Sequence, residues 1–204
     1  MKEKEIQDDL ASIRSLMERS SKFISLSGLS GILAGIYALI GAAAAFYLMR
    51  APINYDQVTF LHLLNVLPYL IAIAAAVLIA SIATCVLLTY QQAKRKGQSI
   101  WGKTSRELLV NMAAPLLTGG LLIIIFLYRG YFGIVAPASL IFYGLALLAA
   151  GNFTFSDVKF LGICQIILGL IAACLPGYGL LFWALGFGVL HIVYGSVMYL
   201  KYDR

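Results

Sequence analysis

The sequence predicts an all-α, polytopic membrane protein with six transmembrane helices, both termini in the cytoplasm, and a cytoplasmic amphipathic helix at the N-terminus. Three observations support this fold class: an apolar composition, six long apolar runs, and a one-sided distribution of Lys and Arg. Of the 204 residues, 61% are hydrophobic and only 12% are charged, and the mean hydropathy is +0.90. Soluble domains carry about 25% charged residues, so this composition is typical of an integral membrane protein.

Each of the six apolar runs is long enough to cross the ~30 Å hydrocarbon core of a bilayer, which takes about 20 helical residues. They cover approximately residues 23–49, 66–90, 107–128, 132–151, 158–176 and 179–200. We therefore expect residues 23–204 to form a single six-helix transmembrane domain. Ahead of the second run, we expect residues 57–67 to form an outer interfacial helix, with a bend near Pro68.

The positions of Lys and Arg predict the orientation of the chain. Only Arg50 and Arg129 fall on one side of the predicted membrane, and the other thirteen fall on the opposite side. The thirteen are Lys2, Lys4, Arg14, Arg19, Lys22, Lys94, Arg95, Lys96, Lys103, Arg106, Lys159, Lys201 and Arg204. Because cytoplasmic loops carry the excess of Lys and Arg, both termini are predicted to be cytoplasmic, in a bacterial cytoplasmic (inner) membrane.

The net charge of +6 therefore needs no nucleic acid partner. Its densest segment is the Lys94–Arg106 loop, which we expect to contact anionic lipid of the inner leaflet.

Residues 1–22 are polar but carry an apolar stripe of Ile6, Leu10, Ile13 and Met17, spaced four, three and four apart. This is the rhythm of an amphipathic helix. Two interpretations stay open: a helix lying on the membrane or on the basic loop, or a docking helix for a cytoplasmic partner or for a second copy in a homo-oligomer.

Residue patterns for catalysis, cofactors and metals give no positive signal. The interiors of the six runs contain no Asp, Glu, Lys or Arg, which argues against a proton-driven carrier and against most intramembrane hydrolases. The two histidines, His62 and His191, are predicted at very different membrane depths, which disfavours bis-histidine haem ligation. The three cysteines, Cys85, Cys164 and Cys174, match no metal-binding spacing. We expect no cofactor, no metal and no enzymatic activity.

A sparse set of polar and helix-breaking residues is predicted at a common depth in the cytoplasmic half of the membrane. It comprises Asn111, Pro115, Thr118, Gln165 and His191. Pro115 lacks an N–H, so the carbonyl of Asn111 loses its helical partner. Either these groups join helices by hydrogen bonds, or they line a pocket for a lipid head group or a neutral small molecule.

Small residues in the first run predict a face for close helix packing. Ser27, Gly31 and Gly35 recur at four-residue spacing, a small-xxx-small pattern. The sequence shows no convincing internal repeat.

The segments "FLGICQIILGL" and "GYGLLFWALGFGVLHIVYGSVMYLKY", together with "LSGLSGILAGIYALIGA" near the N-terminus, resemble a group of small six-span bacterial membrane proteins. No activity is assigned to that group, so the resemblance implies the six-span fold and carries over no substrate or catalytic residue. From the residues themselves we expect a small scaffold or regulatory membrane subunit that acts through partners. The alternative is a binder or carrier of a lipid or neutral small molecule.

Overall fold

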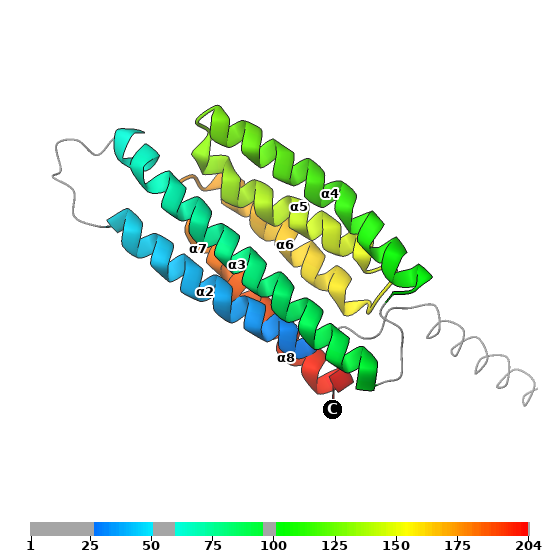
Figure 1. The fold of residues 1–204 in the computed structure, drawn as a ribbon. Coiled ribbons are helices and arrows are strands. Elements are labelled where there is room, and N and C mark those ends of the chain that lie inside the picture. Colours follow the sequence, from blue (N-terminus) through cyan, green and yellow to red (C-terminus); the bar gives the residue numbers. More distant parts are fainter. Residues whose placement is uncertain (1–26, 51–59, 96–100, 204) are drawn as a thin grey trace, which may run out of the picture.

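The computed structural model describes residues 27–50, 60–95 and 101–203, and this part of the chain is helical without strands. The elements are α2 (Gly28–Arg50), α3 (Phe60–Arg95), α4 (Lys103–Tyr128), the short 3₁₀ helix η2 (Phe132–Ile134), α5 (Val135–Ala150) and α6 (Asp157–Cys174). The last helix changes its winding along its length, through α7 (Gly179–Trp183), the π-helical η3 (Ala184–Leu190), α8 (His191–Met198) and the π-helical η4 (Tyr199–Asp203). We call these four segments together the final span (Figure 1).

Among the described residues, six helices are long and apolar enough to cross a membrane, which agrees with the six apolar runs of the sequence. They cover Gly28–Met49, Asn65–Arg95, Lys103–Tyr128, Phe132–Ala150, Asp157–Cys174 and Gly179–Tyr202. The prediction of a separate outer helix before Pro68 is wrong for the described residues, because α3 continues from Phe60 through Pro68 to Arg95. The predicted N-terminal helix, with Ile6, Leu10, Ile13 and Met17, lies outside the described residues.

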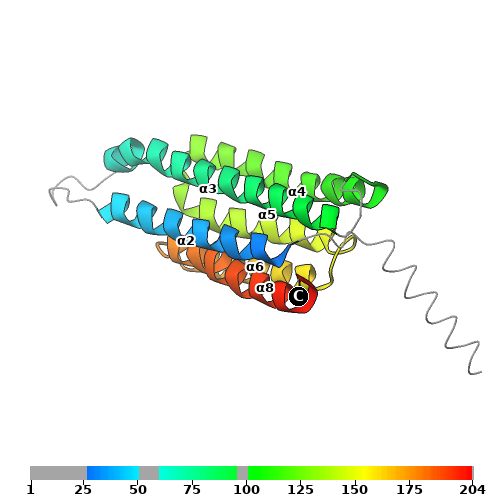
Figure 2. The ribbon, with the colours of Figure 1, turned by 60° about the horizontal axis from the view of Figure 1, so that its bottom comes forward.

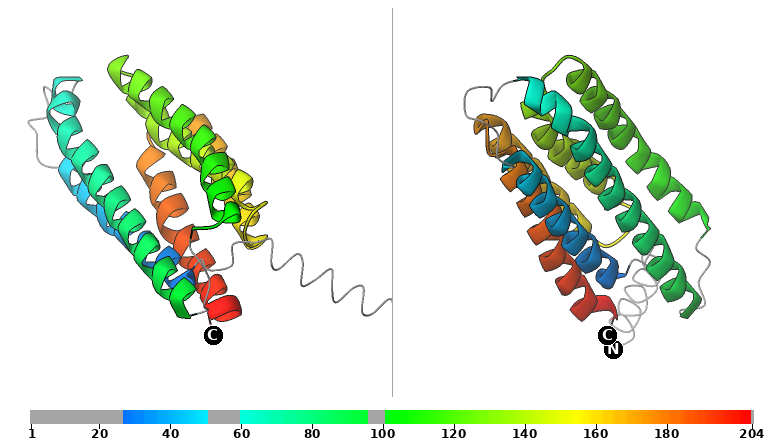
Figure 3. Two further views of the ribbon diagram at one scale, coloured as in Figure 1. Left: turned by 45° about the vertical axis from the view of Figure 1, so that its right-hand side comes forward. Right: turned by 60° about the vertical axis from the view of Figure 1, so that its left-hand side comes forward.

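The helices form three layers of two. Figure 2 shows α3 and α4 in one layer, α2 and α5 in the next, and the final span and α6 in the third. Contacts follow this arrangement: α3 packs on α2, α2 on the final span, α4 on α5, and α5 on α6. The final span also contacts α5 and α6, and it stands between the two helix groups in the left view of Figure 3.

The packing of α2 on the final span depends on glycine. A Cβ atom added to Gly35 would lie 2.6 Å from the carbonyl oxygen of Gly188 and 3.0 Å from the backbone nitrogen of Ile192. A Cβ on Gly195 would lie 2.7 Å from the carbonyl oxygen of Gly28. The two backbones are therefore too close for any larger residue at these positions.

The same contact recurs between α5 and α6. A Cβ on Gly144 would lie 2.6 Å from the carbonyl oxygen of Gly162 and 3.0 Å from the backbone nitrogen of Ile166. A Cβ on Gly169 would lie 3.0 Å from the carbonyl oxygen of Pro137. Both helix pairs are antiparallel, because the first small residue of one helix meets the last glycine of the other.

These contacts reveal that an eight-residue packing motif is repeated along the chain, which was not evident from the sequence alone. All four helices carry Gly-x₃-Ile-x₂-Gly, with Pro in the first place in α5: GLSGILAG (28–35), PASLIFYG (137–144), GICQIILG (162–169) and GVLHIVYG (188–195). In Figure 1, α2 and α5 run in opposite directions, so the two packing units are related by an inversion of chain direction. A motif of three fixed positions at unequal intervals is too weak to recognise without the contacts.

Of the residues predicted to pack, Gly31 and Gly35 face the final span. A Cβ on Gly31 would lie 3.1 Å from the Cα of Gly195. Ser27 precedes α2, and its carbonyl oxygen accepts a 2.6 Å hydrogen bond from the Ser30 hydroxyl.

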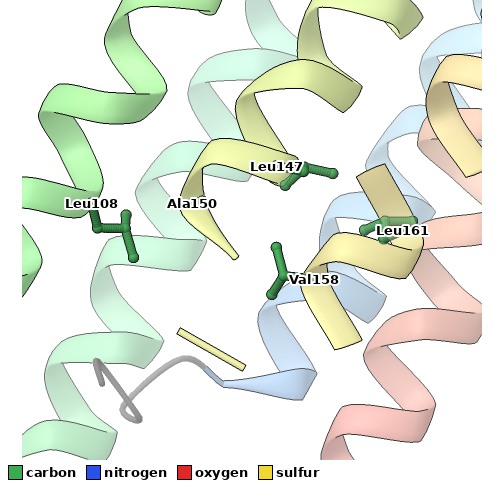
Figure 4. Close-up of a cluster of buried hydrophobic side chains, with 5 residues drawn as sticks. All are labelled: Leu108, Leu147, Ala150, Val158 and Leu161. Carbon is green, nitrogen blue, oxygen red and sulfur yellow. The ribbon is translucent and has the colours of Figure 1, made fainter. Parts of the chain in front are cut away.

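A small apolar cluster joins α4, α5 and α6 near the end where α6 begins. Figure 4 shows its buried members, Leu108, Leu147, Ala150, Val158 and Leu161. It adjoins the glycine contact of α5 and α6, since a Cβ on Gly162 would lie 3.1 Å from the Cβ of Leu147.

A polar clamp ties the end of the final span to the start of α6. The carboxylate of Asp157 accepts hydrogen bonds from the Lys201 ammonium at 3.1 Å and from the Tyr202 hydroxyl at 2.8 Å. The Tyr202 ring stacks on Phe155 with ring centroids 4.0 Å apart. These contacts fix the C-terminal end of the described chain to the second packing unit.

The repeated packing unit makes a matched prediction about stability. Gly35→Ala and Gly144→Ala should each lower the free energy of unfolding by about 1–3 kcal/mol, because the added methyl forces the two backbones apart. Gly120→Ala is the control, since a Cβ there meets nothing within 4 Å. Denaturation by SDS titration of the purified protein measures all three, and a loss at Gly120 equal to the other two would contradict the assignment.

Candidate functional site

The polar group with the most internal contacts lies where the final span meets α5 and α6. It is built from the side chains of Tyr143, Gln165 and His191 and from the backbone carbonyl of Gly186. Gln165 is fully buried and His191 is 7% exposed. Two of the five predicted pocket residues, Gln165 and His191, are thus brought together.

The hydrogen bonds of His191 determine which ring nitrogen carries the proton. Its Nδ1 lies 2.9 Å from the carbonyl oxygen of Gly186. That oxygen can only accept, so Nδ1 is protonated and donates. Nε2 is then the acceptor, and the hydroxyl of Tyr143 donates to it at 2.9 Å. Both ring nitrogens of a neutral imidazole are therefore paired.

Gln165 reaches the same carbonyl from α6. Its Nε2 donates to the Gly186 oxygen at 2.8 Å and lies 3.5 Å from Nδ1 of His191. Because both of these nitrogens are donors, the second contact is one of proximity rather than a hydrogen bond. Gly186 lies within the π-helical segment, where the backbone hydrogen-bond pattern is shifted. One backbone oxygen thus receives side-chain donors from two helices.

Aromatic rings enclose one side of His191. The ring centroid of Tyr143 lies 5.4 Å from that of His191 and 5.1 Å from that of Phe187. Phe187 also stacks on His191 at 5.9 Å and lies 5.1 Å from Trp183. The surroundings are apolar, which strengthens the hydrogen bonds among neutral groups and penalises any unpaired one.

Three buried side-chain atoms have no hydrogen-bond partner in the described part of the chain: Oε1 of Gln165, the hydroxyl of Tyr194 and Oγ1 of Thr89. The positions of the first two follow the repeat. Gln165 and His191 both occupy the fourth place of their motifs, and Tyr143 and Tyr194 both occupy the seventh. Tyr143 pairs with His191, whereas Tyr194 and the Gln165 oxygen remain unpaired, so the polar pairing breaks the symmetry of the packing.

The other predicted pocket residues do not join this group. Asn111 and Thr118 are exposed on α4. The Asn111 amide donates a hydrogen bond to the Glu107 carbonyl at 2.8 Å, within the same helix. The Thr118 hydroxyl likewise donates to the Ala114 carbonyl at 2.8 Å. Pro115 lies within the same helix. The prediction of one cluster across spans three, five and six is therefore wrong for span three. The inner side of α4 is marked instead by its buried residues, Ser105, Leu108 and Gly119.

Sequence reasoning missed two members of the group. Nothing in the sequence distinguished Tyr143 from the other tyrosines, of which the chain has 12 in all. Its one signal is that it directly precedes a glycine, as Tyr194 does. The Gly186 carbonyl carries no sequence signal, because the π-helical turn that presents it is a property of the backbone.

Metal ligation finds no support among the described residues, where no three His, Cys, Asp or Glu side chains are close enough to share an ion. The cysteines Cys85, Cys164 and Cys174 are free thiols. Chemically, the polar group is a set of neutral donors and acceptors that joins three helices.

Comparison with known proteins adds no relative: no protein-family model matches the chain, and no curated protein or solved structure matches it either. The resemblance to small six-span bacterial proteins therefore stays a prediction.

The hydrogen bond between Tyr143 and His191 can be tested against a tyrosine at the equivalent place. Tyr143→Phe should lower the free energy of unfolding by about 1–2 kcal/mol, because it leaves Nε2 of His191 buried and unpaired. Tyr194→Phe should leave stability unchanged or slightly raised, since the Tyr194 hydroxyl has no partner among the described residues. SDS-titration unfolding of both variants checks this, and equal losses in the two variants would contradict a specific stabilising role for the Tyr143–His191 hydrogen bond.

Proposed function

We propose that this chain is a small, non-enzymatic integral membrane protein that acts through partners, as a scaffold or regulatory subunit. The observation that carries the proposal is the polar group around His191. Its hydrogen bonds run between α5, α6 and the final span, so these side chains serve to hold helices together. A cluster of this kind stabilises a bundle in lipid, where each interhelical hydrogen bond contributes about 0.6–2 kcal/mol.

The outer helices supply the surface for partners. In the most apolar 18-residue stretch of α3, no residue is buried against the rest of the described protein, compared with 33% in the corresponding stretches of α5 and α6. Exposed alanines at positions 72, 76 and 83 lie along α3, and small residues allow close approach of another helix. These features favour lateral association within the membrane.

The proposed orientation places both termini in the cytoplasm of a bacterial cell, with the protein in its inner membrane. Lys94 and Arg95 at the end of α3 and Lys103 at the start of α4 lie at the same end of the bundle as Lys201, whereas Arg129 lies at the other (Figure 1). The excess of cations at one end supports its assignment to the cytoplasmic side.

The N-terminal stripe gives the direct test. Replacing Ile6, Leu10, Ile13 and Met17 together by Ser should abolish self-association or co-purification of a cytoplasmic partner, because the apolar face of the predicted helix is removed. A matched variant with Gln7, Asp9, Ser12 and Ser15 replaced by Ala should retain both. Light scattering of the detergent-solubilised protein and affinity purification measure the two properties. Unchanged assembly in the stripe variant would overturn the role given to this segment.

One observation favours a second function, the binding of a neutral small molecule. Oε1 of Gln165 is a buried acceptor without a partner in the described chain, and it lies where the two inverted packing units meet. In transporters built from inverted repeats, binding sites lie at the repeat interface.

Native mass spectrometry of protein purified in mild detergent tests this alternative. A co-purified molecule should be retained by the wild type and by Tyr194→Phe, and lost from Gln165→Leu and His191→Ala. Its absence from the wild type, or its retention by both site variants, would count against the binding function and leave the scaffold role standing.

A further inference from the structure

A hollow opens on the outer side of α4, in its first two turns. It has a volume of about 310 Å³ and is lined by Lys103, Arg106, Glu107, Val110 and Asn111. All five residues are exposed. The hollow is distinct from the polar group around His191, because that group is built from α5, α6 and the final span.

The net charge of the residues that line the hollow is positive, and the charged groups can contact a ligand. Lys103 and Arg106 contribute two cations against one carboxylate, Glu107, and none of the three forms an ion pair with another described residue. The Asn111 amide uses one N–H to bond the Glu107 carbonyl, which leaves a second N–H as a donor. Such a group of donors suits a phosphate.

An apolar stripe continues from the hollow along the same side of α4. Val110 is 63% exposed, Leu117 66%, Leu121 62% and Ile124 62%. Their spacing of seven, four and three places them on one face of the helix, in line with Lys103. The buried residues of α4, Ser105, Leu108 and Gly119, fall on the opposite face, so the stripe points away from the bundle.

We infer that this surface is a specific site for one anionic phospholipid. The phosphate of the head group lies between Lys103 and Arg106 and accepts a hydrogen bond from Asn111, and an acyl chain follows Val110, Leu117 and the residues beyond. Charge at the membrane interface followed by exposed apolar side chains along one helix face matches the two parts of a phospholipid. The inference rests on insertion in a membrane and is independent of any protein partner.

A matched pair of charge variants separates this site from general attraction of lipid to a basic end. Lys103→Gln/Arg106→Gln removes two charges from the hollow. Lys94→Gln/Arg95→Gln removes two exposed charges from the end of α3, at the same end of the bundle. Native mass spectrometry of delipidated full-length protein is used, with phosphatidylglycerol and phosphatidylcholine of identical chains titrated in turn.

We expect the wild type to bind a first phosphatidylglycerol more tightly than phosphatidylcholine. Lys103→Gln/Arg106→Gln should weaken that binding about tenfold or more, since each cation near an anionic surface contributes about 1 kcal/mol. Lys94→Gln/Arg95→Gln and the charge-preserving Lys103→Arg/Arg106→Lys should bind as the wild type does.

Four results would overturn the inference. They are equal affinity for both lipids, equal weakening by the two charge-removing variants, loss of binding in the charge-preserving variant, and displacement of the lipid by millimolar inorganic phosphate, which would indicate a free-anion site. A fifth such result would be a dimer that dissociates on Lys103→Gln/Arg106→Gln, which would assign the surface to a second copy instead.

Discussion

Close contact between glycine-bearing helix faces is the constraint on which the rest of the structure depends. Inside a bilayer, apolar side chains gain little by moving from lipid to a neighbouring helix, so association relies on close van der Waals packing. A Cβ added to Gly35 would lie 2.6 Å from the carbonyl oxygen of Gly188, and one added to Gly144 would lie 2.6 Å from that of Gly162. Backbone therefore packs directly on backbone in both helix pairs. These two pairs, α2 with the final span and α5 with α6, make up the second and third layers, onto which α3 and α4 are added as the first.

The polar group around His191 uses the same motif but does not share its symmetry. The fourth and seventh places that hold Gln165, His191, Tyr143 and Tyr194 correspond between helices, yet only Tyr143 finds a side-chain acceptor. A packing motif can be repeated because it needs only small residues, whereas a hydrogen bond requires a donor and an acceptor at matched positions. A purely structural role therefore does not explain why the Gln165 oxygen and the Tyr194 hydroxyl are buried without a partner in the described chain.

The structure separates an inner part that maintains the fold from outer helices that contact the surroundings. Gly35, Gly144 and the residues around His191 are fixed by neighbours on several sides. By contrast, the exposed side of α3 and the outer stripe of α4 face away from the bundle. The proposed contacts with partners and lipid along α3 and α4 would therefore leave the core undisturbed, as the proposed role of scaffold or regulatory subunit requires.

Composition, apolar run length and charge distribution were sufficient to predict six helices and their approximate limits, because the thickness of a bilayer sets the length of each span. They were insufficient to say which face of each helix meets protein. In an apolar helix, lipid-facing and protein-facing sides look alike, so Asn111 and Thr118 were grouped with Gln165 and His191 although α4 turns them outward.

By itself, then, the sequence determined the number of apolar spans in the described part of the chain and their approximate limits, although it divided α3 at Pro68. Only the tertiary structure decided that Tyr143 and the Gly186 carbonyl complete the group around His191. It also decided that four distant segments share one packing motif. The physical reason is that helix rotation and π-helical winding depend on backbone contacts between distant helices, and local sequence does not encode them.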